Sequence, residues 1–140
     1  MSWTPSKPRA ARYADGEAGE SMVEFALVLP VLLLVLVGVV QFALVHHART
    51  VAETAAIEGA RLAAAEGYSL EDGASRTRDV LEAGLGGTGA AFVVEVDASG
   101  EVVVTRASGE YRLFIPWVTS LSVPVEAQAE VWREGFRGDP

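Results

Sequence analysis

One segment of this chain, residues 25–45, contains no charged side chain and consists mostly of Leu, Val, Phe and Ala. Roughly 21 residues of helix, at about 1.5 Å each, are long enough to cross a hydrocarbon core of about 30 Å. Leucines and valines would cover every face of this helix, whereas a helix at the surface of a soluble domain keeps a polar side. The run predicts a transmembrane helix over about residues 22–45, inside a longer helix over 20–66.

The charges on either side of this run indicate its direction. Lys7, Arg9 and Arg12 precede it, and only Arg49 follows it closely. Because the more basic flank of a membrane helix normally stays in the cytoplasm, residues 1–19 are predicted to form a cytoplasmic leader. The rest of the chain, beyond the helix, is then extracytoplasmic.

A secretory signal peptide is the main alternative, because it also places an apolar region after a basic one. Two features argue against it. The run is longer than the usual apolar region of a signal peptide. Moreover, Leu44, Val45, His46 and His47 stand where a cleavage site made of small residues would be needed.

The start of the run carries an acidic residue at its apolar edge, in the sequence Gly19-Glu20-Ser21-Met22-Val23-Glu24-Phe25. An unpaired carboxylate is unfavourable there, so Glu24 needs a partner. If the chain were cut after Gly19, the new amino group of Glu20 would lie about one helical turn from Glu24. A neighbouring subunit's amine could serve equally, and an uncut chain could let Glu24 snorkel toward the headgroups.

This arrangement resembles the cleavage site of type IV prepilins, in which a glycine precedes the cut and a glutamate is the fifth mature residue. Gly19 and Glu24 match these two positions, and Phe25 matches the aromatic residue that often follows. The resemblance implies a prepilin peptidase that removes residues 1–19 and leaves Glu20 as the mature N-terminus. The apolar helix would stay attached and pack subunits together.

Small residues continue along one helical face beyond the membrane edge. Ala48, Ala52, Ala55 and Gly59 recur at spacings of three and four and predict a seam for close helix packing. On other faces, Arg49 with Glu53 and Glu58 with Arg61 are spaced for intrahelical ion pairs. Within the membrane part, Gly38 is a further packing candidate, and Pro30 should bend the helix.

Residues 19–61 as a whole resemble the TadE-like family of tight-adherence pilus assembly proteins. The likeness combines residues 23–30, Gly38, Gln41-Phe42, Ala48-Arg49 and residues 58–61, in that order. Where the family often has an acidic residue before the phenylalanine and a glycine after it, this chain has Gln41-Phe42-Ala43. The resemblance implies a minor pilin-like subunit that works with a prepilin peptidase, other pilin-like subunits, a secretion ATPase and an inner-membrane platform.

The outer segment, residues 67–133, predicts a small α+β domain of pilin-like type. Ser69 and Asp72 are spaced as the N-terminal cap of a helix that runs to about residue 84. Strands are expected at 92–96, 101–105, 111–115 and 123–132, giving an antiparallel sheet of three to four strands. In the last strand apolar and polar residues alternate, so its apolar face should cover the small-residue helix face.

The connecting segments carry weaker signals. Residues 84–89 are rich in glycine and predict a flexible turn, and residues 97–100 predict a four-residue hairpin loop. The apolar cluster 114–118 could be a partner-binding patch or a plug of the core, and the plug is preferred. The tail, residues 134–140, is expected to be disordered.

Composition excludes several functions. The net charge of −8 disfavours nucleic-acid binding, and a chain without cysteine has no thiol nucleophile and no thiolate metal site. The only histidines, His46 and His47, are neighbours that point in different directions on a helix. We therefore predict no enzyme activity, no metal, no cofactor and no small-molecule substrate. The alternatives to a minor pilin-like subunit are a major pilin, an adhesin-like relative with further domains, and a membrane-anchored binding module without a pilus role.

Overall fold

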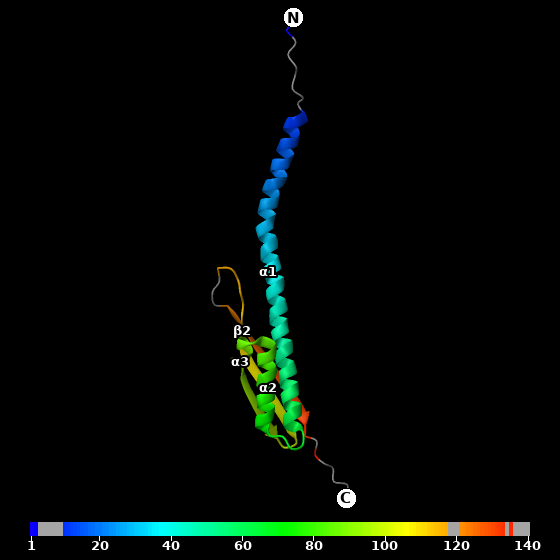
Figure 1. Cartoon of the computed structure of the whole chain (residues 1–140), viewed down its shortest axis with the longest axis vertical. Helices are drawn as coiled ribbons and strands as arrows, with labels where there is room; N and C mark the ends of the chain where they lie inside the picture. The colour runs from blue at the N-terminus through cyan, green and yellow to red at the C-terminus, as the bar shows by residue number, and fades with distance from the viewer. Residues whose placement is uncertain (3–9, 118–120, 134, 136–140) are drawn as a thin grey trace. The chain divides into compact units, whose positions relative to one another are not determined.

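The computed structural model describes residues 1–2, 10–117, 121–133 and 135, with side chains described from Gly16 onward (Figure 1). The chain divides into two compact units, Met1–Val40 and Gln41–Pro140. Helix α1, Ala10–Ala64, contributes to both units. Apart from Gly135, the predicted disordered tail lies outside the described residues, as do Lys7 and Arg9 of the leader.

Among the described residues, the first unit consists of Met1, Ser2 and the N-terminal part of α1. The helix begins at Ala10, ten residues before the predicted start, and continues through Pro30. Leu32, Leu33 and Leu34 are each more than half exposed. Over the described residues, one helix is long and apolar enough to cross a membrane, and its most apolar stretch is not buried within the chain. The bend predicted at Pro30 stays a prediction.

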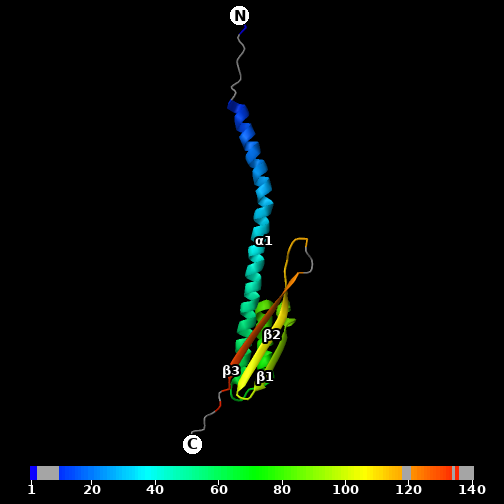
Figure 2. The same ribbon diagram turned by 180° about the vertical axis from the view of Figure 1, so that it is seen from behind.

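The second unit contains a three-stranded antiparallel sheet in the order β1-β2-β3 (Figure 2). Its strands are β1 (Val93–Ser99), β2 (Val102–Arg112) and β3 (Ser122–Trp132). Pairing between β1 and β2 continues to Ser99 opposite Val102, so the hairpin loop is only Gly100 and Glu101. The predicted four-residue loop is therefore wrong. Gly100 has a φ of 63°, a conformation that glycine adopts without strain.

Strand β2 is longer than the sequence indicated. The predicted separate strand at 111–115 is wrong, because Tyr111 and Arg112 belong to β2 and pair with Val123 and Ser122. Gly109 lies inside the continuous strand. A side chain there would overlap the ring of Phe92, so the phenylalanine occupies the space that the glycine leaves.

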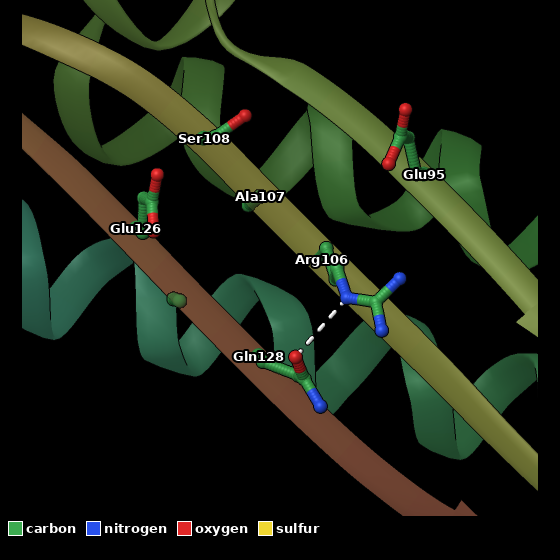
Figure 3. Close-up of a pocket in the computed structure, with 7 residues that line it drawn as sticks. Glu95, Arg106, Ala107, Ser108, Glu126 and Gln128 are labelled. Carbon is green, nitrogen blue, oxygen red and sulfur yellow. Dashed lines mark hydrogen bonds between the residues drawn. The ribbon is translucent and has the colours of Figure 1, made fainter.

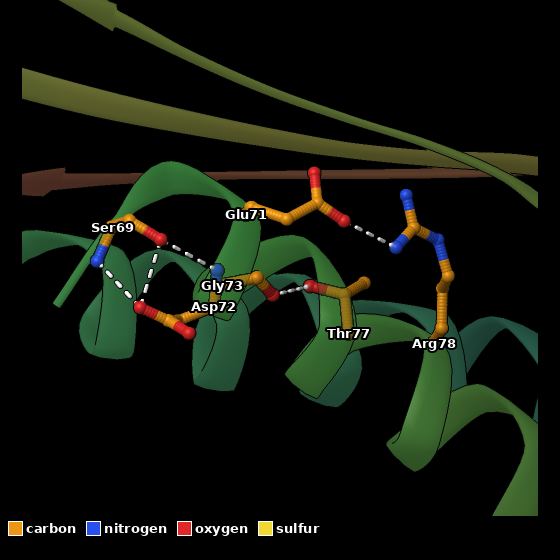
Figure 4. Close-up of polar contacts among 6 residues, drawn as sticks. All are labelled: Ser69, Glu71, Asp72, Gly73, Thr77 and Arg78. Carbon is orange, nitrogen blue, oxygen red and sulfur yellow. Dashed lines mark hydrogen bonds and ion pairs between the residues drawn. The ribbon is translucent and has the colours of Figure 1, made fainter.

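Two further helices lie between α1 and the sheet in the chain. Helix α2, Leu70–Leu85, starts with the predicted cap: the Ser69 hydroxyl accepts from the backbone N–H of Asp72, and the Asp72 carboxylate accepts from the backbone N–H of Ser69 (Figure 4). Helix α3, Gly87–Ala90, then forms within the glycine-rich stretch that was expected to be a flexible turn. Gly89 allows this, because a side chain there would overlap the carbonyl oxygen of Leu81.

The core lies between one face of the sheet and the helices α1 and α2, which Figures 1 and 2 show on the same side of the strands. In β3, Val125, Ala127 and Ala129 are buried, whereas the residues that alternate with them are exposed. They pack in one cluster with alanines of α1, with Leu81 of α2 and with Phe92. The predicted α+β class, with a sheet face that covers the small residues of the helix, is confirmed.

Candidate functional site

The residues expected to direct processing lie together on α1 in the first unit. Gly19, Glu20, Glu24 and Phe25 are all exposed, and a side chain added at Gly19 would have nothing within 4 Å. A helix places Glu20 and Glu24 about one turn apart on the same side. The structure thus leaves this stretch accessible along its whole length.

The small-residue seam consists of Ala48, Ala52, Ala55 and Gly59. All four are buried, and the three alanines have an exposed fraction of 0%. Here the helix carries almost no side-chain bulk on one face, so the sheet and α2 approach its backbone closely. Gly38, proposed as a packing residue on sequence grounds, is different, because a side chain added there would have nothing within 4 Å. The described part of the chain therefore supplies no packing partner for Gly38.

Helices α1 and α2 cross at a pair of glycines. A side chain on Gly59 would overlap Oγ1 of Thr77, and one on Gly73 would meet Cβ of Ala63 at 2.5 Å. Thr77 is fully buried, and its hydroxyl donates a 2.9 Å hydrogen bond to the carbonyl oxygen of Gly73. The contact therefore depends on both glycines and holds α2 against the seam.

An ion pair crosses the same two helices. Nε of Arg76 on α2 donates to a carboxylate oxygen of Glu58 on α1 at 3.0 Å. The predicted pairing of Glu58 with Arg61 is wrong, because α2 brings Arg76 to that carboxylate instead. Within the described residues, Arg49 and Glu53 form no ion pair either. Both partners of the observed pair are partly exposed, so its contribution to stability is small.

Gln41, the polar residue near the end of the apolar run, is tied to a loop far away in the sequence. Its side-chain nitrogen donates to the carbonyl oxygen of Phe114 at 2.7 Å, and its side-chain oxygen accepts from the backbone N–H of Phe114 at 3.2 Å. One amide group thus satisfies both backbone groups of one residue, as a neighbouring strand would. Gln41 acts as a clamp on the connection between β2 and β3.

The clamped connection exposes large apolar side chains. Phe114 is 76% exposed and Trp117 is 91% exposed, so the preferred interpretation of this cluster as a plug of the core is wrong. The loop closes where the backbone N–H of Leu113 donates to the carbonyl oxygen of Leu121 at 2.9 Å. Val118, the last residue of the predicted cluster, lies outside the described residues.

The sheet face that points away from the helices is polar. In Figure 3, Arg106 on β2 lies beside Gln128 on β3, and its Nε donates to the Gln128 side-chain oxygen at 3.1 Å. Glu95 and Glu126 lie along the neighbouring strands of this face. These side chains are exposed to solvent, so this face is a hydrophilic surface rather than a reaction centre.

The titratable groups add little chemistry. The pKa of Asp72 is lowered from its ordinary value because its carboxylate accepts hydrogen bonds from the backbone N–H and the hydroxyl of Ser69. This is the effect of a helix cap, which also places a negative charge at the N-terminus of α2. Among the described residues there is no group of three or more His, Cys, Asp or Glu side chains arranged to hold a metal. The ring of His46 instead stacks on Phe42.

Sequence reasoning missed two of these contacts. Gln41 was noted only as part of the pair Gln41-Phe42 in the TadE-like resemblance, and nothing local pointed to Phe114 as its partner. The pair of Glu58 with Arg76 was missed because a residue one turn away, Arg61, looked sufficient. Both partners come from the folding of distant segments onto α1.

The comparisons with known proteins agree with the resemblance read from the sequence. A family model described as TadE-like protein matches residues 19–61. The match begins at Gly19 and runs along α1 past the seam residue Gly59. No curated protein and no solved structure matches the chain. Residues 19–61 are therefore similar to the TadE-like family, which is the family that the motifs of this segment indicated.

Proposed function

We propose that this protein is a minor pilin-like subunit, a pseudopilin, of a tight-adherence pilus assembly system, cut after Gly19 by a prepilin peptidase. The observation that carries the proposal is the TadE-like match over residues 19–61, which starts at the glycine of the cleavage motif. The match and the apolar helix indicate a pilus-associated membrane protein in which a structural role, and not catalysis, is expected.

The exposure of the first unit supports processing at this position. A peptidase embedded in the membrane must reach the backbone after Gly19, and the structure leaves Gly19 and Glu20 uncovered. After the cut, the new amino group of Glu20 becomes a positive charge about one helical turn from the Glu24 carboxylate. This charge, or the same amine of a neighbouring subunit, supplies the partner that Glu24 needs at the apolar edge.

The exposed apolar surface of α1 supports assembly with other helices. Leucines and valines over residues 27–40 find no partner within the described chain, and lipid or other helices must cover them. In a pilin-like assembly, these side chains pack against the matching helices of other subunits. The partners are therefore other pilin-like subunits and the inner-membrane platform. The leader would lie in the cytoplasm and the second unit outside the inner membrane.

The decisive experiment is the mature N-terminal sequence of the membrane-extracted protein, made in cells with and without a prepilin peptidase. Gly19→Val should block processing because a branched side chain would fill the position before the cut. Gly16→Val is the matched control, since Gly16 is also an exposed helical glycine with nothing within 4 Å. We expect a start at Glu20 for the wild type and for Gly16→Val, only when the peptidase is present.

Other results would contradict the proposal in different ways. An intact N-terminus in cells that have the peptidase would leave a membrane-anchored binding module, the second candidate, in which α1 is merely an anchor. A start beyond Val45 would favour ordinary secretion. The exposed polar face of the sheet is the surface that would suit the second candidate, and deletion of residues 1–19 should leave such an anchor working.

A second test concerns Glu24. Glu24→Gln removes the charge but keeps the size, so the cut should still occur while pairing with the new amino group is lost. Co-purification with other pilin-like subunits should then fall, whereas Glu20→Gln, which changes an exposed carboxylate one turn earlier, should keep it. If both variants co-purified with the other subunits equally well, Glu24 would have no role in assembly.

A further inference from the structure

The connection between β2 and β3 presents an apolar surface that the described parts of the chain leave open. Residues 113–125 carry no charge, and within them Phe114 and Trp117 are exposed by 76% and 91%. Such large exposed aromatic side chains mark an interaction surface. The clamp from Gln41 ties this loop to one defined place on α1.

The position of Gln41 along the apolar run indicates what covers the loop. The run ends at Val45, and the helix rises about 1.5 Å per residue, so Gln41 lies about 6 Å inside the end of the spanning stretch. Because the whole run matches a hydrocarbon core of about 30 Å, Gln41 and its partner Phe114 lie close to the boundary between acyl chains and headgroups. Tryptophan and tyrosine are enriched at this level, which suits Trp117.

The hydrogen bonds of the loop suit such a water-poor place. Backbone groups near the hydrocarbon need partners from the protein itself. The side chain of Gln41 satisfies both backbone groups of Phe114, and the bond from Leu113 to Leu121 satisfies two more at the base of the loop. In return, the backbone of Phe114 provides hydrogen-bond partners for both ends of the polar Gln41 side chain within the apolar run.

We propose that residues 113–117, at the start of the connection between β2 and β3, are a second membrane contact, in which Phe114 and Trp117 enter the outer interface of the bilayer and Gln41 fastens this segment at that depth. The domain is then held at the membrane at two points, α1 and this segment, so one end of the sheet stays at the membrane surface. The inference requires only that the run 25–45 spans the bilayer. It stands whether or not the chain is cut after Gly19, so it is tested separately from processing.

The test uses the full chain, loaded as one copy per phosphatidylcholine nanodisc, with bromine atoms on the lipid acyl chains as quenchers of tryptophan fluorescence. The chain has three tryptophans, so Trp3→Phe with Trp132→Phe leaves Trp117 as the reporter. The matched control is Trp3→Phe with Trp117→Phe, which leaves Trp132, an exposed residue at the opposite end of the sheet. Circular dichroism checks that both variants keep the wild-type sheet.

We expect brominated lipid to quench Trp117 at least severalfold more than Trp132. Equal quenching of the two reporters would overturn the proposal. Burial of Trp117 that occurs only in discs with two copies would also overturn it, since a second copy would then be the partner. In the Trp117 reporter, Gln41→Leu should lower the quenching at least twofold, and unchanged quenching would show that Gln41 does not fasten the loop.

Discussion

The first, apolar part of α1 and its second part, which packs in the domain, are built from different side chains. Before residue 40 the helix carries leucine and valine, and Leu32, Leu33 and Leu34 are more than half exposed. From Ala48 onward one face carries alanine and glycine that are buried by the rest of the domain. Helix α1 therefore carries large side chains where the described chain supplies no neighbour. It carries small side chains where the rest of the domain packs against it.

This difference teaches that hydrophobic size alone does not locate the core of the domain. The core around α1 depends on how closely backbones approach, as at Gly59 and Gly73, and less on large side chains. The leucines and valines before residue 40, although far more apolar, are not among the core residues of the domain. Substitutions of the same kind in the two regions should thus have different costs for the stability of the domain.

The largest contrast is expected for leucine. Leu81→Ala empties a site with 0% exposure in the core, and such substitutions cost about 2–5 kcal/mol in the free energy of unfolding. Leu34→Ala removes the same atoms from a side chain that is 53% exposed and should leave the domain unchanged. Urea unfolding of the full chain in mild detergent, followed by circular dichroism, measures both. Similar losses would break the comparison between the two regions.

Glycine should give the next largest contrast. Gly59→Ala places a methyl group onto Oγ1 of Thr77 and 2.7 Å from the carbonyl oxygen of Gly73. Overpacking of this kind costs about 1–3 kcal/mol, which outweighs the gain in helix propensity of about 1 kcal/mol. Gly38→Ala meets nothing within 4 Å and should leave the unfolding of the domain unaltered. If Gly59→Ala stabilised the domain, close approach of α1 and α2 could not be what holds it.

A smaller effect is expected at the start of α2, which begins outside the core and relies on its cap. Ser69→Ala removes the hydroxyl that accepts from the backbone N–H of Asp72 and should cost about 1 kcal/mol. Ser75→Ala is the control, because Ser75 is an exposed serine within the same helix. The same unfolding measurement applies. Equal stability of the two variants would show that α2 is held by the seam alone.

The smallest effect concerns pH. The pKa of Asp72 is lowered in the folded protein, so its carboxylate stabilises the fold above the ordinary aspartate pKa of about 3.9. This contribution is lost as the pH falls through the lowered pKa of the folded state. Between about pH 5 and about pH 2, the free energy of unfolding should therefore fall less steeply with decreasing pH in Asp72→Asn than in the wild type. An identical decline would assign the acid sensitivity to other carboxylates.

The elements that could be predicted from the sequence were those with a local signal. The uncharged run indicates a spanning helix, Ser69 and Asp72 mark the start of α2, and alternation identifies β3. Each of these patterns depends only on residues within a few positions of one another. The membrane topology and the cut after Gly19 rest on equally local patterns and stay predictions.

The errors came from contacts between distant segments. Two strands were expected at 101–105 and 111–115, but the structure has one strand, in which the ring of Phe92 fills the space beside Gly109. The loop containing Phe114 looked like a plug because apolar residues are usually buried, whereas Gln41 holds it in an exposed position. Sequence spacing contains no information on such partners, so the candidate membrane contact became visible only in the fold.

The order of the strands has a consequence for how the domain folds. Because β1, β2 and β3 are neighbours in the same order in the sheet and in the chain, each pairing closes only a short stretch of chain. Pairing between strands that are neighbours in the chain favours fast formation of the sheet. The sheet can thus form strand by strand, and β3, the last strand to be added, brings the valine and alanines that close the core over α1.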